Sequence, residues 1–504
     1  MTALDYVILA LYLVGVAALG IRLGGKQTSA SDYFLGGHRL PWWAVSLSIV
    51  ATETSSLTVI SIPAVAYGGS LVFFQLTFGY LAGRILVAVL LLPRFMKGDL
   101  KTAYGYLGER FGQRTRSVAS ITFMITRLLA DGVRLFATAI PVRVILLSSG
   151  FDVDYPVIIA VISAVTVAYT FVGGLRAVVW MDVVQLFLYL AGAFTALALL
   201  LNDAPSGWME TAGEAGKLTW FAWGEGISGI LTGPYTFVTA TVGGAIFSLA
   251  SHGTDQLIVQ RLLACRSLAD SRKALIASAF VVMAQFALFL FIGLQLWVHY
   301  GGAGFAELGL ARGDEIFPKY IIEGLPAGVS GLFLAGIIAA SMSTLSSSLS
   351  ALASSTVFDF GRRPDSHDPA KELQISRLTT LVWGVVFVVF ANLFSDQENP
   401  VVELGLSIAS FTYGGLLGAF LLGLWNPRAR GTDASIALVI SVAAMVLVIF
   451  GVWQTADGSW IFSFKPGTEQ IANRGLIPLA WPWYTTVGAS ITLVVGSLTA
   501  LRHR

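Results

Sequence analysis

The sequence predicts an all-α polytopic membrane protein, and two observations carry that prediction. Of its 504 residues, 56% are hydrophobic and only 12% are charged, whereas a soluble domain usually has about 25% charged residues. Apolar runs such as 7–23, 276–300 and 434–452 approach the ~20 residues that a helix needs to cross ~30 Å of hydrocarbon. Because such runs recur along the chain, residues 1–504 are expected to form a single membrane transport domain.

Thirteen spans are expected from the apolar runs that lie between charged or Gly/Pro-rich breaks. The first follows Asp5 and lacks a basic leader and a small-residue cleavage site, which predicts a retained helix rather than a signal peptide. The expected spans begin near residues 4, 42, 71, 117, 155, 178, 233, 274, 328, 376, 400, 433 and 482.

The positions of the basic residues predict the orientation, because short cytoplasmic loops retain Lys and Arg. With the N-terminus outside, 22 of the 31 basic residues fall in inner loops or at the C-terminus, five fall in outer loops and four within spans. We therefore expect a multi-pass protein of the cytoplasmic membrane with its N-terminus outside and its C-terminus in the cytoplasm. The five outer residues are Lys217, Arg312, Lys319, Lys465 and Arg474, and the four within spans are Arg84, Arg127, Arg134 and Arg143.

Composition also limits the partners and the chemistry. The formal net charge of +2 gives no basic surface for nucleic acid, and the single Cys265 excludes an internal disulfide framework. A nucleophile with a base at usable spacing is not apparent, so an enzyme is not expected. The expected partners are a small-molecule solute and the lipid bilayer, with no organic cofactor and with a monomer as the functional unit.

The second span contains a polar segment at 48–58, SIVATETSSLT, in which hydroxyl residues surround Glu53. Ionisable groups at membrane depth cost about 2.5–3.5 kcal/mol on insertion scales and usually face a cavity or a partner. One interpretation is that the helix unwinds here and offers backbone carbonyls to a cation, as the broken helices of secondary transporters do. The alternative is a buried polar packing patch.

Two further spans carry residues suited to a cation. In the ninth span, steps of three and four place five serines on one helix face, where hydroxyls either bind a hard cation or only permit close helix packing. In the sixth span, Asp182 either contributes negative charge to a cation site or caps a helix N-terminus. The serines are Ser343, Ser346, Ser347, Ser350 and Ser354.

The fourth span places Arg127, Asp131 and Arg134 on one face, with spacings of four and three residues. An internal ion pair accounts for Asp131 and one arginine. The second arginine is then left over, and this favours an anionic group on the solute.

Four sequence elements resemble the sodium:solute symporter family, in the same order and over nearly the whole chain. They are DYFLGG at 32–37, GGLRAVVWMDVVQ around Asp182, GTDQLIVQR at 253–261, and an A-x-x-S-T pattern at 340–344. The resemblance implies the leucine-transporter-type fold, with two five-helix inverted repeats. These are spans two to six, near 42–202, and spans seven to eleven, near 233–425, with spans 1, 12 and 13 peripheral.

The resemblance also implies one or two sodium ions. A first site would use backbone carbonyls from spans two and nine with two hydroxyls, and a second would join the aspartate of span six to serines of span nine. The first set is Ala51, Thr54, Ala340, Ser343 and Thr344, and the second is Asp182, Ser343, Ser346 and Ser347.

The expected solute site departs from that of sugar-carrying relatives. Ser251 and His252 stand where those relatives resemble one another in having aromatic and amide residues, and Glu53 replaces a short polar residue. His252 is interpreted as a packed, hydrogen-bonded residue rather than a titrating gate. The expected solute-site residues are Glu53, Thr58, Arg127, Asp131, Arg134, Ser251 and His252.

The sequence thus predicts a sodium-coupled symporter that imports a small polar or anionic organic solute by alternating access. Two other classes stay open: a proton-coupled carrier, with Glu53 or Asp182 taking the proton, and a transporter-like membrane sensor.

Overall fold

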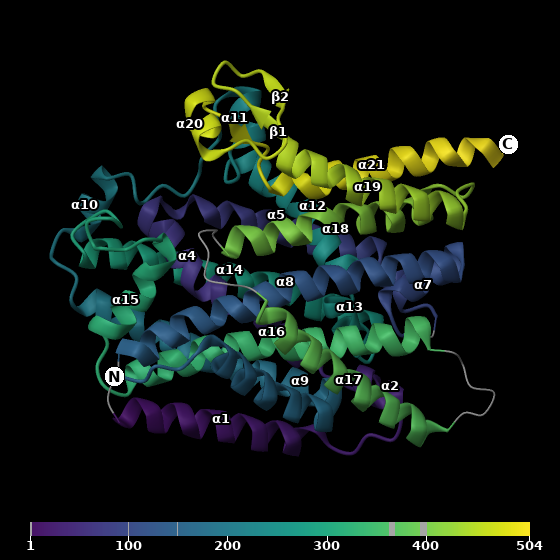
Figure 1. The fold of residues 1–504 in the computed structure, drawn as a ribbon, viewed down its shortest axis with the longest axis horizontal. Helices are drawn as coiled ribbons and strands as arrows, with labels where there is room; N and C mark the ends of the chain where they lie inside the picture. Colours follow the sequence, from purple (N-terminus) through teal and green to yellow (C-terminus); the bar gives the residue numbers. More distant parts are fainter. Residues whose placement is uncertain (1–2, 99, 149, 362–367, 394–400, 504) are drawn as a thin grey trace.

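The computed structural model describes residues 3–98, 100–148, 150–361, 368–393 and 401–503, and they are mostly helical (Figure 1). The first part of the chain forms α1 (Ala3–Gly24), α2 (Ala30–Leu35), α3 (Trp42–Glu53), α4 (Ser56–Gly68), α5 (Leu76–Leu90), α6 (Leu92–Phe95), α7 (Ala103–Phe111), α8 (Gln113–Ser148) and α9 (Tyr155–Asn202). The middle forms α10 (Trp208–Glu214), α11 (Gly226–Thr232), α12 (Gly244–Gly253), α13 (Gln256–Leu263), α14 (Leu268–His299), α15 (Ile316–Glu323) and α16 (Val329–Phe360). The last part forms α17 (Pro369–Ala391), α18 (Val401–Trp425), α19 (Gly431–Gly451), α20 (Thr468–Arg474) and α21 (Pro482–Ala500).

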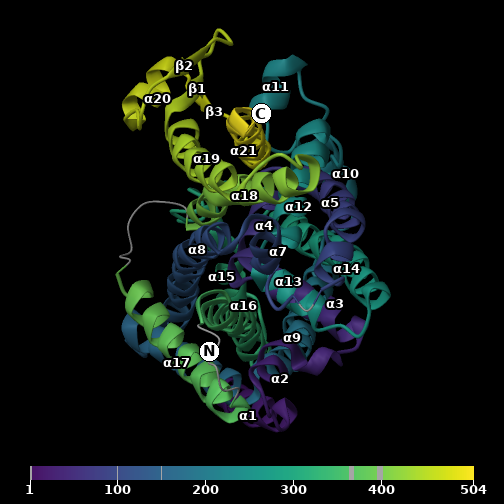
Figure 2. The same ribbon diagram turned by 90° about the vertical axis from the view of Figure 1, so that its right-hand side faces the viewer.

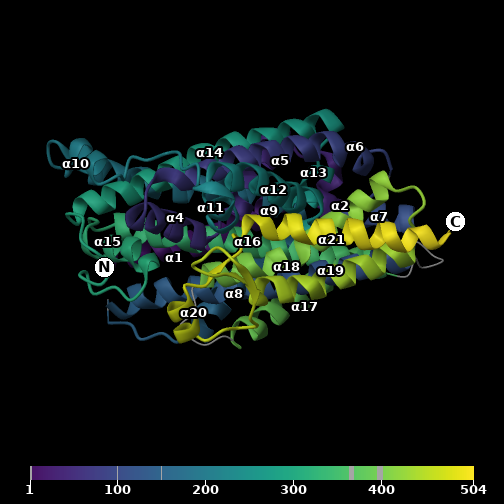
Figure 3. The ribbon, with the colours of Figure 1, turned by 90° about the horizontal axis from the view of Figure 1, so that it is seen from above.

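The long helices run side by side, and α16 is the one at the centre (Figures 2 and 3). Among the described residues, eight helices are long and apolar enough to cross a membrane, or nine if the bent pair α3 and α4 is one span. In the most apolar stretch of α16, 89% of the residues are buried, against 17% of those in the corresponding stretch of α1. The serine-rich face of α16 therefore packs inside protein, and α1 lies at the periphery.

The α9 helix contains a break that makes two of the expected spans. A straight helix of its 48 residues would be about 72 Å long, more than twice the hydrocarbon thickness. Gly174 interrupts it with non-helical angles, φ 56° and ψ −158°. Only glycine fits there, because a Cβ would lie 2.4 Å from the Tyr33 carbonyl oxygen. The two segments correspond to the spans expected near 155 and 178.

Several helices begin earlier than their apolar runs. We expected spans near 274 and 376, but α14 begins at Leu268 and α17 at Pro369. The Ser267 side chain accepts a hydrogen bond from the Asp270 N–H at 3.2 Å, and Asp368 accepts one from the Ala370 N–H at 3.0 Å. These N-caps stabilise polar first turns, which a search for apolar residues overlooks.

The all-α expectation overlooked a small antiparallel sheet between α19 and α21. Its strands are β1 (Val452–Gln454), β2 (Trp460–Phe462) and β3 (Ile477–Pro478), in the order β2-β1-β3. Val452 pairs with Phe462 and Gln454 with Ile477. The strands are two or three residues long, too short to give an alternating pattern that sequence alone distinguishes from a loop.

Candidate functional site

A cavity of about 200 Å³ lies beside the junction of α3 and α4. Aromatic side chains make much of its wall, and charged and hydroxyl groups enter it from α3, α8 and α12. Ser251 and His252 are not aromatic, but α12 contributes one aromatic residue to the wall and other elements contribute the rest. The aromatic wall consists of Phe73, Tyr80, Tyr235, Phe247, Phe286, Tyr413 and Trp481.

The polar segment of the second span is unwound. Thr54 and Ser55 have extended backbone angles (ψ 96° and 169°), and the two helices meet at a bend of 63°. The last backbone hydrogen bond of α3 runs from the Thr54 N–H to the Val50 carbonyl at 3.0 Å. The final carbonyls of a helix lack intrahelical partners, so this break offers oxygen ligands inside the protein. Local hydroxyls that compete for backbone groups allow such a break without Gly or Pro.

The central helix α16 faces this break. The Thr344 hydroxyl lies 3.4 Å from the Thr52 carbonyl oxygen and 3.3 Å from the Ala340 carbonyl oxygen. The Thr54 hydroxyl accepts a hydrogen bond from Gln285 at 2.7 Å. The structure thus brings α16 to the end of α3, where Ala51 also lies, fully buried.

Asp182 lies at the centre of a fully buried cluster rather than at a helix N-terminus. Its carboxylate accepts hydrogen bonds from Ser343 at 2.7 Å and from Ser48 at 2.5 Å. The Arg261 guanidinium forms an ion pair with it at 3.0 Å, and both side chains have zero exposure. Asp182 is eight residues beyond the Gly174 break, so the helix-capping interpretation is wrong.

The serines of α16 divide among different partners. Ser347 contacts the Arg261 guanidinium, which also donates to Ser48 at 2.8 Å. Ser346 donates to the Ser343 carbonyl of its own helix at 3.0 Å. Of the four residues expected at a second sodium site, Asp182, Ser343 and Ser347 share one cluster, and Arg261 is a member that we did not expect.

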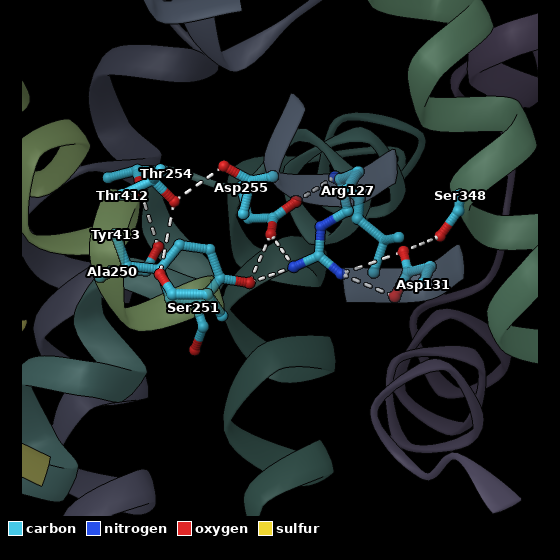
Figure 4. A network of polar contacts seen from close by, with 12 residues as sticks. Arg127, Asp131, Ala250, Ser251, Thr254, Asp255, Ser348, Thr412 and Tyr413 are labelled. Atoms are coloured by element: carbon cyan, nitrogen blue, oxygen red, sulfur yellow. Dashed lines mark hydrogen bonds and ion pairs between the residues drawn. The ribbon is translucent and has the colours of Figure 1, made fainter. Parts of the chain in front are cut away.

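The fourth-span arginines belong to a cluster that we call the cavity cluster: Arg127, Asp131, Arg134 and Asp255. Figure 4 shows Arg127 between Asp131 and Asp255. Arg127 lies 3.4 Å from Asp131 and also contacts Asp255 and Tyr413. The Tyr413 hydroxyl donates to Asp255 at 2.7 Å. Asp131 forms a second ion pair with Arg134 at 3.1 Å.

The cavity cluster changes the charge argument. We expected one arginine to be left over after Asp131 was paired, but Asp255 supplies a second carboxylate and the four charges balance. Arg127, Arg134 and Asp255 all line the cavity, and Arg134 is the more exposed of the two arginines, with 22% of its side chain exposed against 6% for Arg127.

Glu53 also lines this cavity. It forms an ion pair with Arg84 at 2.5 Å, and its carboxylate lies 3.6 Å from His252 Nε2. His252 is packed, with 3% exposure, and its Nδ1 lies 2.9 Å from the Ser251 hydroxyl. The expected residues Thr58, Ser251 and His252 all line the cavity.

Several site residues were missing from our sequence analysis. Arg84 was counted only for orientation, although a lone arginine within an apolar run usually marks a buried charge that has a partner and a function. Asp255 and Arg261 belong to the GTDQLIVQR element, which we used only for its resemblance. Nothing in the local sequence pointed to Tyr413 or Trp481 as site residues. Both lie late in the chain and reach the cavity only when the chain is folded.

The family model described as the sodium:solute symporter family matches residues 33–452. This chain belongs to the sodium:solute symporter family. A sodium/sialic acid symporter, NanT of Aliivibrio fischeri, is 29% identical over 499 residues, which cover 99% of this chain and 93% of that protein. The human sodium/iodide cotransporter is 32% identical over 463 residues, covering 88% of this chain and 70% of the cotransporter.

Solved structures agree with this assignment to the symporter family. A Na⁺-coupled sialic acid symporter in a substrate-bound, outward-open state has a TM-score of 0.81 and 26% identity, covering 99% of this chain and 98% of that one. A closed transporter of the nucleobase-cation-symport-1 family has a TM-score of 0.58 at 15% identity over 95% of each chain. The second likeness shows a common fold.

Proposed function

We propose that this symporter uses sodium entry to import a small polar or anionic organic solute by alternating access. The observation that carries the proposal is the unwound junction of α3 and α4, which faces α16 on one side and lines the aromatic cavity on the other. One short segment can therefore bind a cation and contribute to the solute pocket. The names of the relatives, which include sodium-coupled carriers of sialic acid, iodide and monocarboxylates, support the same activity.

The coupling sodium is assigned to the oxygen atoms at this junction. Sodium is a hard cation, and carbonyl and hydroxyl oxygens are the ligands that hard cations prefer. The Thr344 hydroxyl already lies within 3.4 Å of two carbonyl oxygens. The assigned ligands are the carbonyls of Ala51, Thr54 and Ala340 with the hydroxyls of Ser343 and Thr344.

The finer architecture follows the family resemblance. We propose thirteen spans that begin near the expected positions. The helices α3 to α9 would form one five-helix repeat, and the chain from 233 through α18 would form the inverted second repeat. The helices α1, α19 and α21 would be peripheral, with the N-terminus outside the cytoplasmic membrane. The residues that line the cavity belong to one chain, and we propose a monomer as the transporting unit. The proposal requires neither an organic cofactor nor enzymatic chemistry.

The cavity favours a solute with a polar or anionic group and an apolar body. The aromatic wall would cover the body, and Arg134 and Glu53, which both line the cavity, offer a donor and an acceptor. Thr58 and Ser251 add hydroxyls. Arg127, Asp131 and His252 would hold these groups in place rather than bind the solute directly, because they are more deeply buried.

The sodium gradient and the membrane potential supply the driving force. Moving one elementary charge through 100 mV is worth about 2.3 kcal/mol, which corresponds to more than a tenfold concentration of a neutral solute for each sodium. A monovalent anion that enters with one sodium moves no net charge, so its accumulation depends on the sodium gradient alone. Sodium bound at the junction would fix α4 against α16 and complete the pocket, and both ligands would leave when the inner side opens.

The test is an uptake screen with the purified symporter in liposomes. Amino acids, sugars, monocarboxylates and acidic sugars are each offered under an inward sodium gradient, and again under an inward proton gradient without sodium. We expect at least one solute to accumulate only with sodium. Accumulation driven by protons alone would replace this proposal with a proton-coupled carrier. Sodium-dependent binding with no accumulation would favour a sensor.

A further inference from the structure

The GTDQLIVQR element forms a short helix, α13, whose polar residues are all buried. Asp255, Gln256, Gln260 and Arg261 have 0–1% exposure. Three of these polar side chains lie on the eight-residue helix and Asp255 is its N-cap, and burying all four is costly unless each one is paired. Their partners therefore show what this helix does.

One end of α13 contacts the solute cavity. Asp255 caps the helix by accepting a hydrogen bond from the Leu257 N–H at 2.9 Å. Its second oxygen contacts Arg127 and accepts the Tyr413 hydroxyl, and Figure 4 shows these groups pointing at one another. Asp255, Arg127 and Tyr413 all line the cavity.

The other end of α13 contacts the Asp182 cluster. Arg261 donates to Asp182 at 3.0 Å and to Ser48 at 2.8 Å, and it contacts Ser347. It also donates to the Leu257 carbonyl of its own helix at 2.7 Å. The guanidinium is therefore attached to α13 as well as to the cluster.

Between the two ends, α13 is bonded to the serine face of α16. Gln260 donates to Ser350 at 3.0 Å and to the Phe34 carbonyl at 2.7 Å. Gln256 donates to Ser354 at 3.3 Å. Serines that first suggested cation ligands thus serve to hold α13.

We infer that Arg261 is an internal cation that competes with sodium for Asp182, and that α13 connects this competition to the solute cavity. The inference rests on the proposed function and deepens it. While Arg261 stays in place, its positive charge compensates the charge of Asp182. The inference therefore assigns one coupling sodium to this symporter in that state.

The physical reason is the cost of a buried charge. A guanidinium and a sodium ion at one buried carboxylate would leave one positive charge without compensation, and such a charge costs several kcal/mol. Sodium can enter only when the guanidinium leaves. Because the guanidinium is bonded to α13 at Leu257, its departure would shift the helix that Asp255 caps. By linkage, if a solute that alters the Asp255 contacts changes the sodium affinity by some factor, sodium changes the affinity for that solute by the same factor.

The variant Arg261→Gln tests this by freeing the carboxylate. Two quantities are measured: the sodium concentration for half-maximal uptake, and the shift in melting temperature that sodium produces in the purified protein. We expect the half-maximal concentration to fall about fivefold or more, the Hill coefficient to rise above one, and the sodium-induced thermal shift to grow. Values equal to those of the wild type would overturn the inference.

Two controls separate charge from packing. The double variant Asp182→Asn with Arg261→Gln removes both charges and should show no gain in sodium affinity over the wild type; a gain there would overturn the inference. Gln260→Met loosens α13 but keeps Arg261, so it should show no gain, and the same gain as in Arg261→Gln would also overturn it.

If Arg261→Gln does not fold, Arg261→Lys serves in its place. A lysine keeps the charge but loses the planar fork that contacts Asp182, Ser48 and Ser347 together. It should weaken the competition and lower the half-maximal sodium concentration; an unchanged or higher value would overturn the inference. The absence of any sodium effect in the wild type would instead overturn the proposed function.

Discussion

Two groups of buried charges in this symporter differ in one respect: access to the cavity. In the cavity cluster, two arginines and two aspartates balance, yet Arg134 keeps 22% of its side chain exposed. In the pair of Asp182 and Arg261, both side chains have zero exposure. Both groups are electrically neutral, so charge balance alone does not distinguish a ligand-binding site from an ion pair that only links helices.

The comparison shows that exposure decides which charge can bind a ligand. Arg134 can change partners without moving the backbone, because one of its faces already borders the cavity. Arg261 has no such freedom while Asp182, Ser48 and Ser347 surround it. The first group is therefore suited to recognising a solute, and the second to responding to a cation or a helix movement.

The largest expected effect comes from breaking the enclosed pair. Asp182→Asn leaves the Arg261 charge buried and uncompensated, which should cost about 3–5 kcal/mol of stability. The measurement is thermal or chemical unfolding of the purified protein in detergent. Asp152→Asn is the matched control, because its pair with Arg143 is 71% exposed on the aspartate side and should contribute at most about 1 kcal/mol. Equal losses in both variants would break the comparison.

A smaller loss of stability is expected inside the cavity cluster. Arg127→Gln removes contacts to Asp131, Asp255 and Tyr413, and charged hydrogen bonds contribute about 1.5–3 kcal/mol. Arg134 still pairs with Asp131, and the Tyr413 hydroxyl still donates a hydrogen bond to Asp255. A carboxylate that loses its cation can also take up a proton, whereas a guanidinium cannot lose one, so the loss should be less than for Asp182→Asn. The same unfolding assay measures it, and a variant as stable as the wild type would show that Arg127 is not the centre of this cluster.

The smallest effect on stability, but a distinct effect on binding, is expected at Arg134. Arg134→Gln should change the unfolding free energy by about 1 kcal/mol or less, because the side chain is partly exposed. For an anionic solute it should weaken affinity about tenfold or more, since one charged hydrogen bond is lost. Solute-induced thermal shifts measure this, with Arg143→Gln on the same helix as control. Unchanged affinity would mean that the solute is neutral at this position.

Much of the fold could be predicted from the sequence, because membrane helices are local features. Apolar runs located the long helices to within a few residues, and the misplaced starts of α14 and α17 come from polar caps. The hydroxyl-rich segment around Glu53 indicated either unwinding or polar packing, and the backbone at Thr54 and Ser55 shows unwinding.

The charge pairs could not be predicted in the same way. Arg127 and Tyr413 are 286 residues apart, and Asp182 and Arg261 are 79 apart. Nothing in the local sequence states which carboxylate meets which arginine. The expectation of a left-over arginine failed because only the fourth span was counted, whereas Asp255 approaches from α13.

The sodium dependence of uptake in three single variants of α16 tests the central claim most directly. Ser343→Ala and Thr344→Ala each remove a hydroxyl assigned to sodium at the α3–α4 junction. Ser355→Ala is the matched control, because its buried hydroxyl has no hydrogen-bond partner among the described residues. We predict that the half-maximal sodium concentration rises about tenfold in the first two, as expected for the loss of one ligand worth ~1.4 kcal/mol, and stays unchanged in the third. Unaltered sodium dependence in both Ser343→Ala and Thr344→Ala would contradict the assignment of sodium to this junction.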